Sequence, residues 1–589
     1  MTDFIHPAIF FIFGALLIPL IPKKFKKIFL LGLPLIAFYC VLNMKTGVYG
    51  AYNYLDFDIV FGRVDSLSKV FAHVFTLMSF IGVLFGIHVE DDSQHIASYF
   101  YVGGSLGVVF AGDYLTVFIF WEMMALASTF LIWFRREPAS LKSGQRYLLM
   151  HIFGGLLLLG GIFLHYQKTG SIAFVQLFPE NAGIAEYLIL AGFALNAAVF
   201  PLHAWLPDAY PEATVTGAVF MCAFTTKTAV YVLARGFQGF EVLAIMGTVM
   251  TIYGVCYATI ENDMRRILSY HIISQVGYMV AGVGIGGALA INGACAHAYA
   301  HILYKALLFM GAGSVLMMTG TSKLNELGGL YKYMPLTMIF YIIGGISISG
   351  FPFFSGFVSK SMVIAGAAEG GHQYLMLLML LAAVGTFLSV GLKLPYFAFF
   401  GKDCGLKPKE PPKNMLWAMG IAAFLCFIIG VYPKALYDLL PFKEAALEFH
   451  PYNMAHMSET LQILLFTGLG FFLLLKRLQP EDKINLDFDW FYRNILNGFM
   501  WFDQNIIQTI DSAWGNVWKN VGIKVLMMSI ARFFAWFDRW AIDGVVDNVA
   551  YGTRWIGDKA RKIQTGNLQN YLALAILIIF VIVGVHWFL

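Results

Sequence analysis

The chain has 589 residues, of which 59% are hydrophobic and 13% charged, with a formal net charge of +4 and a mean hydropathy of +0.71. This composition excludes a soluble globular protein of this length and predicts a polytopic membrane protein. The six cysteines show no CxxC spacing and lie mostly within apolar segments, so we predict no disulfide framework and no metal site. No catalytic or redox motif is apparent, and we expect no cofactor and no nucleic-acid partner.

About sixteen apolar stretches approach the ~20 residues that a helix needs to cross the hydrocarbon core. They centre near residues 14, 36, 78, 104, 124, 156, 194, 225, 250, 277, 304, 352, 386, 425, 468 and 579. The first run, 6–22, is long enough to span and is followed by a basic loop, so we predict no cleavable signal. An N-terminus outside places the basic loops at 23–27, 135–136, 265–266, 402–413 and 476–477 in the cytoplasm, which predicts a multi-pass protein of the inner (cytoplasmic) membrane.

Two of the predicted spans contain helix breakers. In the first, Pro201, Pro207 and Pro211 remove backbone donors. In the second, Pro352 lies in the sequence GFPFFSG. Irregular backbone persists at membrane depth only when it is buried in protein or lines water. Two broken spans in comparable positions of two halves indicate an inverted-repeat transporter with its ion path at the repeat interface.

Several ionisable residues lie inside the apolar segments. A charged side chain at the bilayer centre costs roughly 2.5–3.5 kcal/mol, so each is a candidate for an ion path. Glu122 and Lys227 have apolar neighbours on both sides, and Lys227 is the obvious opposite charge for Glu122. Lys360 follows the second break. Lys393 lies near a span end, where a snorkelling lysine is the simpler interpretation.

His297, His301 and Lys305 recur at i, i+4 and i+8, so they share one helix face. Two histidines at this spacing also suit a metal pair, but no HExxH motif and no third ligand is evident. A proton relay is the preferred interpretation because imidazole titrates near neutral pH.

The last hundred residues change character. From 485 to 564 apolar residues recur at helical spacing, with no run long enough to span. We predict amphipathic helices along a membrane or a partner, or alternatively short helices folded back on the chain's own loops.

Five motifs together resemble the proton-translocating antiporter-like family, which includes large membrane subunits of respiratory complex I, membrane-bound hydrogenases and Mrp-type cation/proton antiporters. They are the pair Trp121-Glu122, the block 201–227, NDMRRILSYHIISQVGY (262–278), HAYAHILYKALLFMGAG (297–313) and GFPFFSGFVSK (350–360). The resemblance covers roughly 65–435. DGVVDN (543–548) and QTGNLQNY (564–571) resemble the lateral helix and closing span of the distal complex I subunit, whereas TTKTAVYVLAR (225–235) resembles a D-type Mrp subunit.

The resemblance implies an all-α polytopic membrane protein with about fourteen core transmembrane helices in two inverted five-helix repeats, two broken helices, a lateral amphipathic helix and a closing span. The domains expected are N-terminal helices (1–95), a first repeat (96–240), a second repeat (241–400), C-terminal helices (401–484), the lateral helix region (485–567) and a final transmembrane anchor (568–589).

The resemblance also implies a function: translocation of protons, with or without Na⁺, along a midplane chain of charged residues in a multisubunit complex. Carried over by motif, Glu122 is the acidic partner, Lys227 a relay, His297, His301 and Lys305 the connection, and Lys360 the terminal residue. Asn196 occupies a position where the family usually has a lysine. An amide cannot carry a proton, so either Lys227 takes this role or this half couples differently or is silent.

Two other functions stay open, and so does a place in a translocase such as a quinone oxidoreductase or hydrogenase complex. One is a channel or coupling subunit that supports a peripheral partner such as an inorganic-carbon uptake protein, which Asn196 favours. The other is a stand-alone secondary transporter. The partners expected are lipid and other membrane subunits, contacted through 485–567.

Overall fold

The computed structural model describes residues 4–483 and 485–588. Residues 1–3, 484 and 589, at the edges of three predicted domains, lie outside the described residues. The chain forms two compact units, 1–488 and 489–589, which we call the bundle and the tail.

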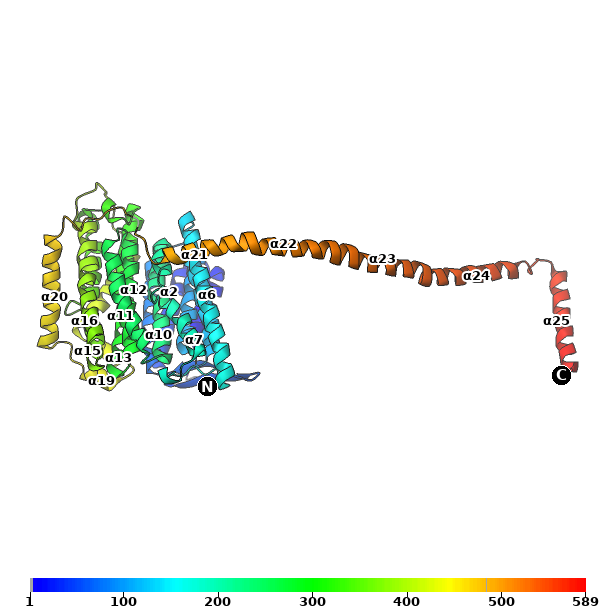
Figure 1. The fold of residues 1–589 in the computed structure, drawn as a ribbon, viewed down its shortest axis with the longest axis horizontal. Coiled ribbons are helices and arrows are strands. Elements are labelled where there is room, and N and C mark those ends of the chain that lie inside the picture. Colours follow the sequence, from blue (N-terminus) through cyan, green and yellow to red (C-terminus); the bar gives the residue numbers. More distant parts are fainter. Residues whose placement is uncertain (1–3, 484, 589) are drawn as a thin grey trace. The chain divides into compact units, whose positions relative to one another are not determined.

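The bundle consists of helices whose axes run roughly parallel to one another (Figure 1). Its continuous helices are α1 (Ala8–Leu17), α2 (Lys23–Asn43), α3 (Ser66–Gly86), α4 (Asp92–Phe110), α5 (Tyr114–Trp133), α6 (Pro138–Thr169), α11 (Glu241–Ile260), α12 (Met264–Ile285), α13 (Ala288–Thr319), α17 (Lys413–Val431) and α20 (Met454–Leu473). Other spans are built in pieces: α7 (Ile184–Asn196) with α8 (Trp205–Ala209), α9 (Val215–Ala223) with α10 (Thr225–Gly236), α14 (Pro335–Ser349) with α15 (Ser355–Glu369), and α16 (Gln373–Thr386) continued to Phe400. Short helices α18 (Lys434–Tyr437) and α19 (Lys443–Glu448) precede α20.

Every predicted span centre falls on a helix except 352, which falls on the turn between α14 and α15. The predicted all-α polytopic fold is therefore confirmed, and the chain is a multi-pass membrane protein. The sequence analysis missed one feature, an antiparallel hairpin of β1 (Gly47–Tyr54) and β2 (Phe57–Val64) between α2 and α3. A search for long apolar runs passes over such strands, because their signal is alternation with a period of two.

The two halves of the bundle repeat each other at a spacing of 150 residues. Asp113 caps the N-terminus of α5 and Asp263 that of α12, and each forms an antiparallel bridge, to residues 173 and 323. α6 and α13 both have 32 residues and both end at a left-handed glycine, Gly170 and Gly320. Between Asp113 and Asp263 the chain crosses five times, as α5, α6, α7–α8, α9–α10 and α11. An odd number of crossings inverts the second copy relative to the first, as predicted.

Glycines allow α11 and α12 to approach closely. A Cβ at Gly247 or Gly254 of α11 would lie 2.3 and 2.6 Å from backbone atoms of α12, and a Cβ at Gly284 of α12 would lie 2.0 Å from the Ala244 nitrogen. Small residues of this kind let helix backbones pack closely in membranes, where the hydrophobic effect does not drive helix association. This contact fixes the start of the second repeat.

The tail is helical from Asp489 to Arg561. Its α-helical parts are α21 (Asp489–Phe502), α22 (Gln508–Val517), α23 (Met528–Phe537) and α24 (Gly544–Arg561), joined by wider π-type turns, and α25 (Leu568–Phe588) follows. No described side chain of these five helices is buried. The tail therefore presents exposed apolar side chains throughout its length.

The bundle ends at an anchored carboxylate. Asp487, 6% exposed, accepts hydrogen bonds from His203 Nε2 (3.2 Å), from Tyr270 Oη (2.7 Å) and from the Tyr253 hydroxyl. Burial disfavours the ionised form, but the hydrogen bond and charge of His203 and the bonds from both tyrosines lower the pKa of Asp487 to about 2. The residue that leads into the tail is thereby fixed to the loop of the first broken helix, which contains His203.

We expect Asp487→Asn to release this segment. The amide keeps the shape but weakens bonds to a charged acceptor, each worth about 1.5–3 kcal/mol. Proteolysis within 475–488 should accelerate at least about tenfold, because ~1.4 kcal/mol is a factor of ten in the open population. The depressed pKa means that the stabilisation is complete above about pH 4, so the difference between the proteins should be constant from pH 5 to 8.

The matched control is Asp482→Asn in the same segment. Asp482 is 66% exposed and pairs with Lys323 at 3.3 Å, and exposed pairs contribute little. Equal proteolysis rates for Asp487→Asn and Asp482→Asn would contradict the anchoring role.

Candidate functional site in the membrane core

Lys227 lies directly after an interruption of its own span. α9 ends at Ala223 and α10 begins at Thr225, with Phe224 at φ −99°, ψ −63°. The Lys227 ammonium donates to the Cys222 carbonyl at 2.6 Å and to Thr226 Oγ1 at 3.0 Å. The interruption therefore supplies a carbonyl acceptor for a buried cation.

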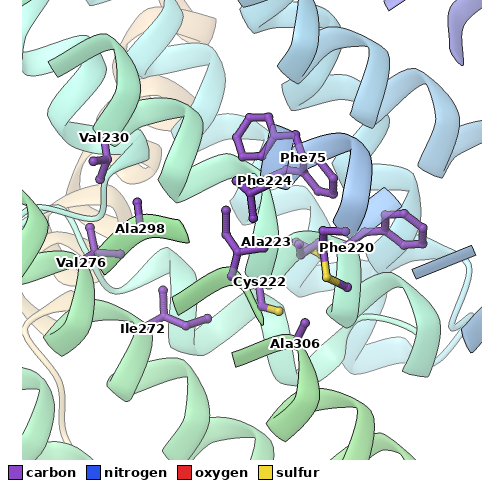
Figure 2. Close-up of a cluster of buried hydrophobic side chains, with 14 of the residues drawn as sticks. Phe75, Phe220, Cys222, Ala223, Phe224, Val230, Ile272, Val276, Ala298 and Ala306 are labelled. Atoms are coloured by element: carbon purple, nitrogen blue, oxygen red, sulfur yellow. The ribbon is translucent and has the colours of Figure 1, made fainter. Parts of the chain in front are cut away.

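Apolar side chains enclose this interruption. Figure 2 shows Phe75, Phe220 and Phe224 gathered beside Cys222. The rings of Phe75 and Phe224 lie 5.0 Å apart, and the side chain of Lys227 is fully buried. Water-excluding packing of this kind strengthens the interaction between the ammonium and the carbonyl dipole.

Lys360 repeats the arrangement at the second broken helix. α14 ends at Ser349, Gly350 adopts a left-handed φ of +76°, and α15 begins at Ser355. The Lys360 ammonium donates to the Ile348 carbonyl at 3.0 Å and lies 5.1 Å from the centre of the Tyr278 ring. The negative end of the α14 dipole thus faces the lysine.

Lys393 also binds the end of a helix. Its ammonium donates to the carbonyls of Thr259 and Glu261, both at 2.7 Å, where α11 ends. The side chain is 4% exposed. Both acceptors lie where the continuous span α11 ends, close in sequence to the basic pair at 265–266, so the contact agrees with a lysine that reaches toward the end of its span.

Lys305 and His301, on α13, have no such acceptors. Lys305 Nζ and both ring nitrogens of His301 are buried without a hydrogen-bond partner among the described residues. His297 is better satisfied, with its Nδ1 3.1 Å from Ser359 Oγ. Buried polar groups in proteins are bonded to protein or to ordered water, so the face of α13 that carries Lys305 and His301 is suited to hold water.

Further polar groups extend from α13 toward Lys393. On α12, His271 Nε2 lies 2.6 Å from Ser389 Oγ, and Gln275 donates to Thr386 Oγ1 at 3.3 Å. All four side chains are buried. Ser389 and Thr386 belong to the span that carries Lys393. α13 packs against α9 and α10 on the Lys227 side and against α12 and α15 on the other.

In the first half, Asn196 is the last residue of α7, directly before the break. Both of its side-chain polar atoms, and the Thr228 hydroxyl, are buried without a partner among the described residues. A backbone carbonyl next to this break, that of Leu195, accepts its hydrogen bond from Trp205 Nε1 at 3.0 Å and not from a lysine. Pro201 lies in the connection before α8, Pro207 within α8, and Pro211 in the 3₁₀ turn that follows.

The structure does not bring Glu122 and Lys227 together. The carboxyl group of Glu122 faces α6, where Oε1 would lie 2.1 Å from a Cβ at Gly155, and this oxygen is buried without a partner among the described residues. The expected ion pair is wrong because Lys227 is already bound to a released carbonyl of its own span. In the 150-residue repeat, Gly155 corresponds to Lys305 and Glu122 to Ile272, so the two halves carry these charged residues at different positions.

Sequence reasoning missed a cluster in the first half. His151 is buried, with Nδ1 bonded to the Tyr147 carbonyl at 2.9 Å and Nε2 without a partner among the described residues. The Tyr147 hydroxyl bonds to Ser128 at 2.8 Å, and Tyr101 bonds to Thr225 at 2.5 Å. The available signal was the repeat, because His151 lies 150 residues before His301.

The arrangement has the chemistry of a proton path. It combines buried lysines on carbonyl acceptors with imidazoles and hydroxyls that both donate and accept hydrogen bonds. Among the described residues no group of three or more His, Cys, Asp or Glu side chains is placed to hold a metal ion.

Comparisons with known proteins agree with this geometry. Residues 111–388 match the family profile described as NADH:quinone oxidoreductase/Mrp antiporter, TM. The chain is 29% identical over 575 residues to the A-type subunit of the Na(+)/H(+) antiporter of Alkalihalophilus pseudofirmus, covering 82% of this chain and 70% of that protein. It is 28% identical over 487 residues to the A1-type subunit of the Na(+)/H(+) antiporter of Staphylococcus aureus, covering 72% and 60% respectively.

Solved structures share the fold. A chain of the Mrp complex from Dietzia sp. DQ12-45-1b superposes with a TM-score of 0.67 at 21% identity, covering 78% of this chain and 98% of that one. A chain of respiratory complex I from Thermus thermophilus gives 0.64 at 22% identity, covering 74% and 98%. With the profile match and the relatives, these results lead to one conclusion: this chain is similar to antiporter-like membrane subunits and shares their fold.

Proposed function

We propose that this chain is the ion-translocating subunit of a multisubunit cation/proton antiporter. The observation that supports it most directly is that three buried lysines, Lys227, Lys360 and Lys393, each bind a carbonyl at a helix end, beside buried polar groups suited to hold water. Its relatives are named as Na(+)/H(+) antiporter subunits. The carbonyl stabilises the protonated form of each lysine, because it accepts a hydrogen bond from the ammonium group. Since the ammonium group has few hydrogen-bond partners in the protein, it can still release a proton to water.

The proposed route runs through both halves. Lys227 is the relay of the first half, and Lys305, His301 and His297 of α13 connect it to Lys360. His271 and Lys393 form a second branch beside α16. Glu122 and His151 are the ionisable groups that feed Lys227. The hydroxyls of Tyr101 and Tyr147 both bond to Thr225, and the Tyr147 ring stacks on His151.

Asn196 favours a second candidate function. A buried amide at the first break cannot take up or release a proton, so this half would conduct more weakly than one with a lysine there. A coupling subunit that supports the activity of a peripheral partner tolerates such a half-channel. The two functions differ in what the isolated complex does without any added partner. An antiporter subunit transports under these conditions, whereas a coupling subunit requires its peripheral partner.

We further propose an inner-membrane location with the N-terminus and the hairpin outside, since the basic loops then lie in the cytoplasm. Other membrane subunits would bind the tail. Ile495, Phe499 and Phe502 of α21 are 72%, 57% and 43% exposed, and an apolar surface that extends through the tail requires a partner or lipid.

Lys227→Ala should abolish transport while the complex still assembles. The substitution removes a relay group but also removes a costly buried charge. We expect cation-driven proton flux in inverted vesicles to fall by roughly 10²-fold, as for the loss of a proton-transfer group. The stoichiometry of the purified complex should not change.

The control is Lys69→Ala. Lys69 also donates to a carbonyl at a helix end, that of Met44 at 2.9 Å, but lies outside the proposed route. Wild-type flux from assembled Lys227→Ala, or an equal loss in both variants, would refute the role of Lys227.

Substituting Ile495, Phe499 and Phe502 together by Ser should weaken association of the neighbouring subunits, since each loses most of its apolar area. Co-purification of those subunits should fall while the bundle still inserts. The matched control replaces Asn494, Gln504 and Gln508 by Ser. Undiminished co-purification of the apolar triple variant would contradict binding through α21.

A further inference from the structure

The second half of the bundle holds a cavity at the end of the proposed route, beside Lys360. It has a volume of about 40 Å³ and lies between α15, α16 and α20. Its polar lining consists of Ser349, Lys360, Ser361, His456, Glu459 and Thr460. A water molecule needs roughly 10–15 Å³ of such volume, so two or three fit. The remaining lining is largely aliphatic.

Resting on the proposed function, we infer that His456 and Glu459 of α20 form the mouth through which Lys360 exchanges protons with water. These residues recur with Thr460 and Ile463 at i, i+3, i+4 and i+7, so one face of α20 lines the cavity. The passage therefore has the Glu459 carboxyl group at its outer end and the Lys360 ammonium group at its inner end.

Burial along the passage decreases toward α20. Lys227 and Lys305 are 0% exposed, whereas Lys360 is 4% and Ser361 is 9% exposed. His456 is half-buried and Glu459 is exposed. Lys360 is buried at the inner end of the cavity, and the lining becomes more exposed toward His456 and Glu459.

The packing of α20 explains why the passage opens toward one side. The described buried residues of α20 are Leu464, Thr467 and Phe471, all in its second half. There Phe471 lies 5.7 Å from Tyr396, ring to ring. Near His456 the helix is loosely packed, at the end adjoining α19 and on the side of the N-terminus (Figure 1). The mouth therefore faces the side of the hairpin.

The test measures flux and accessibility in the complete complex. His456→Gln with Glu459→Gln should lower proton flux about tenfold, because both proton-exchanging groups at the mouth are lost, and Glu459→Asp should retain most of the flux. The matched control, Glu448→Gln with His450→Gln, makes the same chemical changes on the same side but outside the cavity lining, and should transport as wild type.

Accessibility gives an independent readout. A cysteine at Ser361→Cys should react with a charged, membrane-impermeant thiol reagent added on the hairpin side, and Thr460→Trp should slow that reaction. An unreactive Ser361→Cys overturns the inference. So does wild-type flux in the double variant when Lys360→Ala abolishes flux. If Lys360→Ala also transports as wild type, the proposed function fails together with the inference.

Discussion

A lysine ammonium in the membrane core needs an acceptor, and a continuous helix has none to offer because each carbonyl is already bonded within the ladder. This chain meets the constraint by ending helices at membrane depth. Lys227 binds the Cys222 carbonyl where α9 ends, and Lys360 binds the Ile348 carbonyl where α14 ends. Lys393 instead binds carbonyls at the end of the continuous span α11. The broken helices and the buried charges are therefore two parts of one device, each of which would be unfavourable without the other.

Two buried side chains without a hydrogen-bond partner among the described residues lie between the two lysine-bearing spans. Lys305 and His301 lie on α13, which contacts both the α9–α10 span and α15. Because no described residue satisfies these side chains, we propose that water bonds to them and completes a relay between Lys227 and Lys360. The halves differ at equivalent positions: Gly155 in α6 faces the Glu122 carboxyl, whereas its counterpart in α13 is Lys305. The repeat thus carries these charged residues at different positions in its two halves.

The sequence alone predicted the helices, the two breaks and the residues that carry charge, since apolar length, proline and isolated lysines are local signals. The sequence did not predict which groups these charged residues contact. The opposite charges of Glu122 and Lys227 suggested an ion pair. The acceptor of Lys227 is a backbone carbonyl, and the identity of a residue does not show whether its carbonyl is available. Lys393 was interpreted as a snorkelling lysine, because the position of a residue within its span does not show which helix ends lie beside it. His151 and Asp487 were missed, the first because the repeat is too diverged to see by identity, the second because its partners lie over 200 residues away.

The central claim is that helix-end carbonyls, and not a carboxylate, hold the buried lysines beside a hydrated face of α13. The most direct measurement is a density map of the assembled complex at a resolution that shows ordered water. The account predicts the Lys227 ammonium on the Cys222 carbonyl, the Lys360 ammonium on the Ile348 carbonyl, and water bonded to Lys305 and His301. Lys227 bonded to Glu122, or a dry and tightly packed surface around Lys305 and His301, would contradict it.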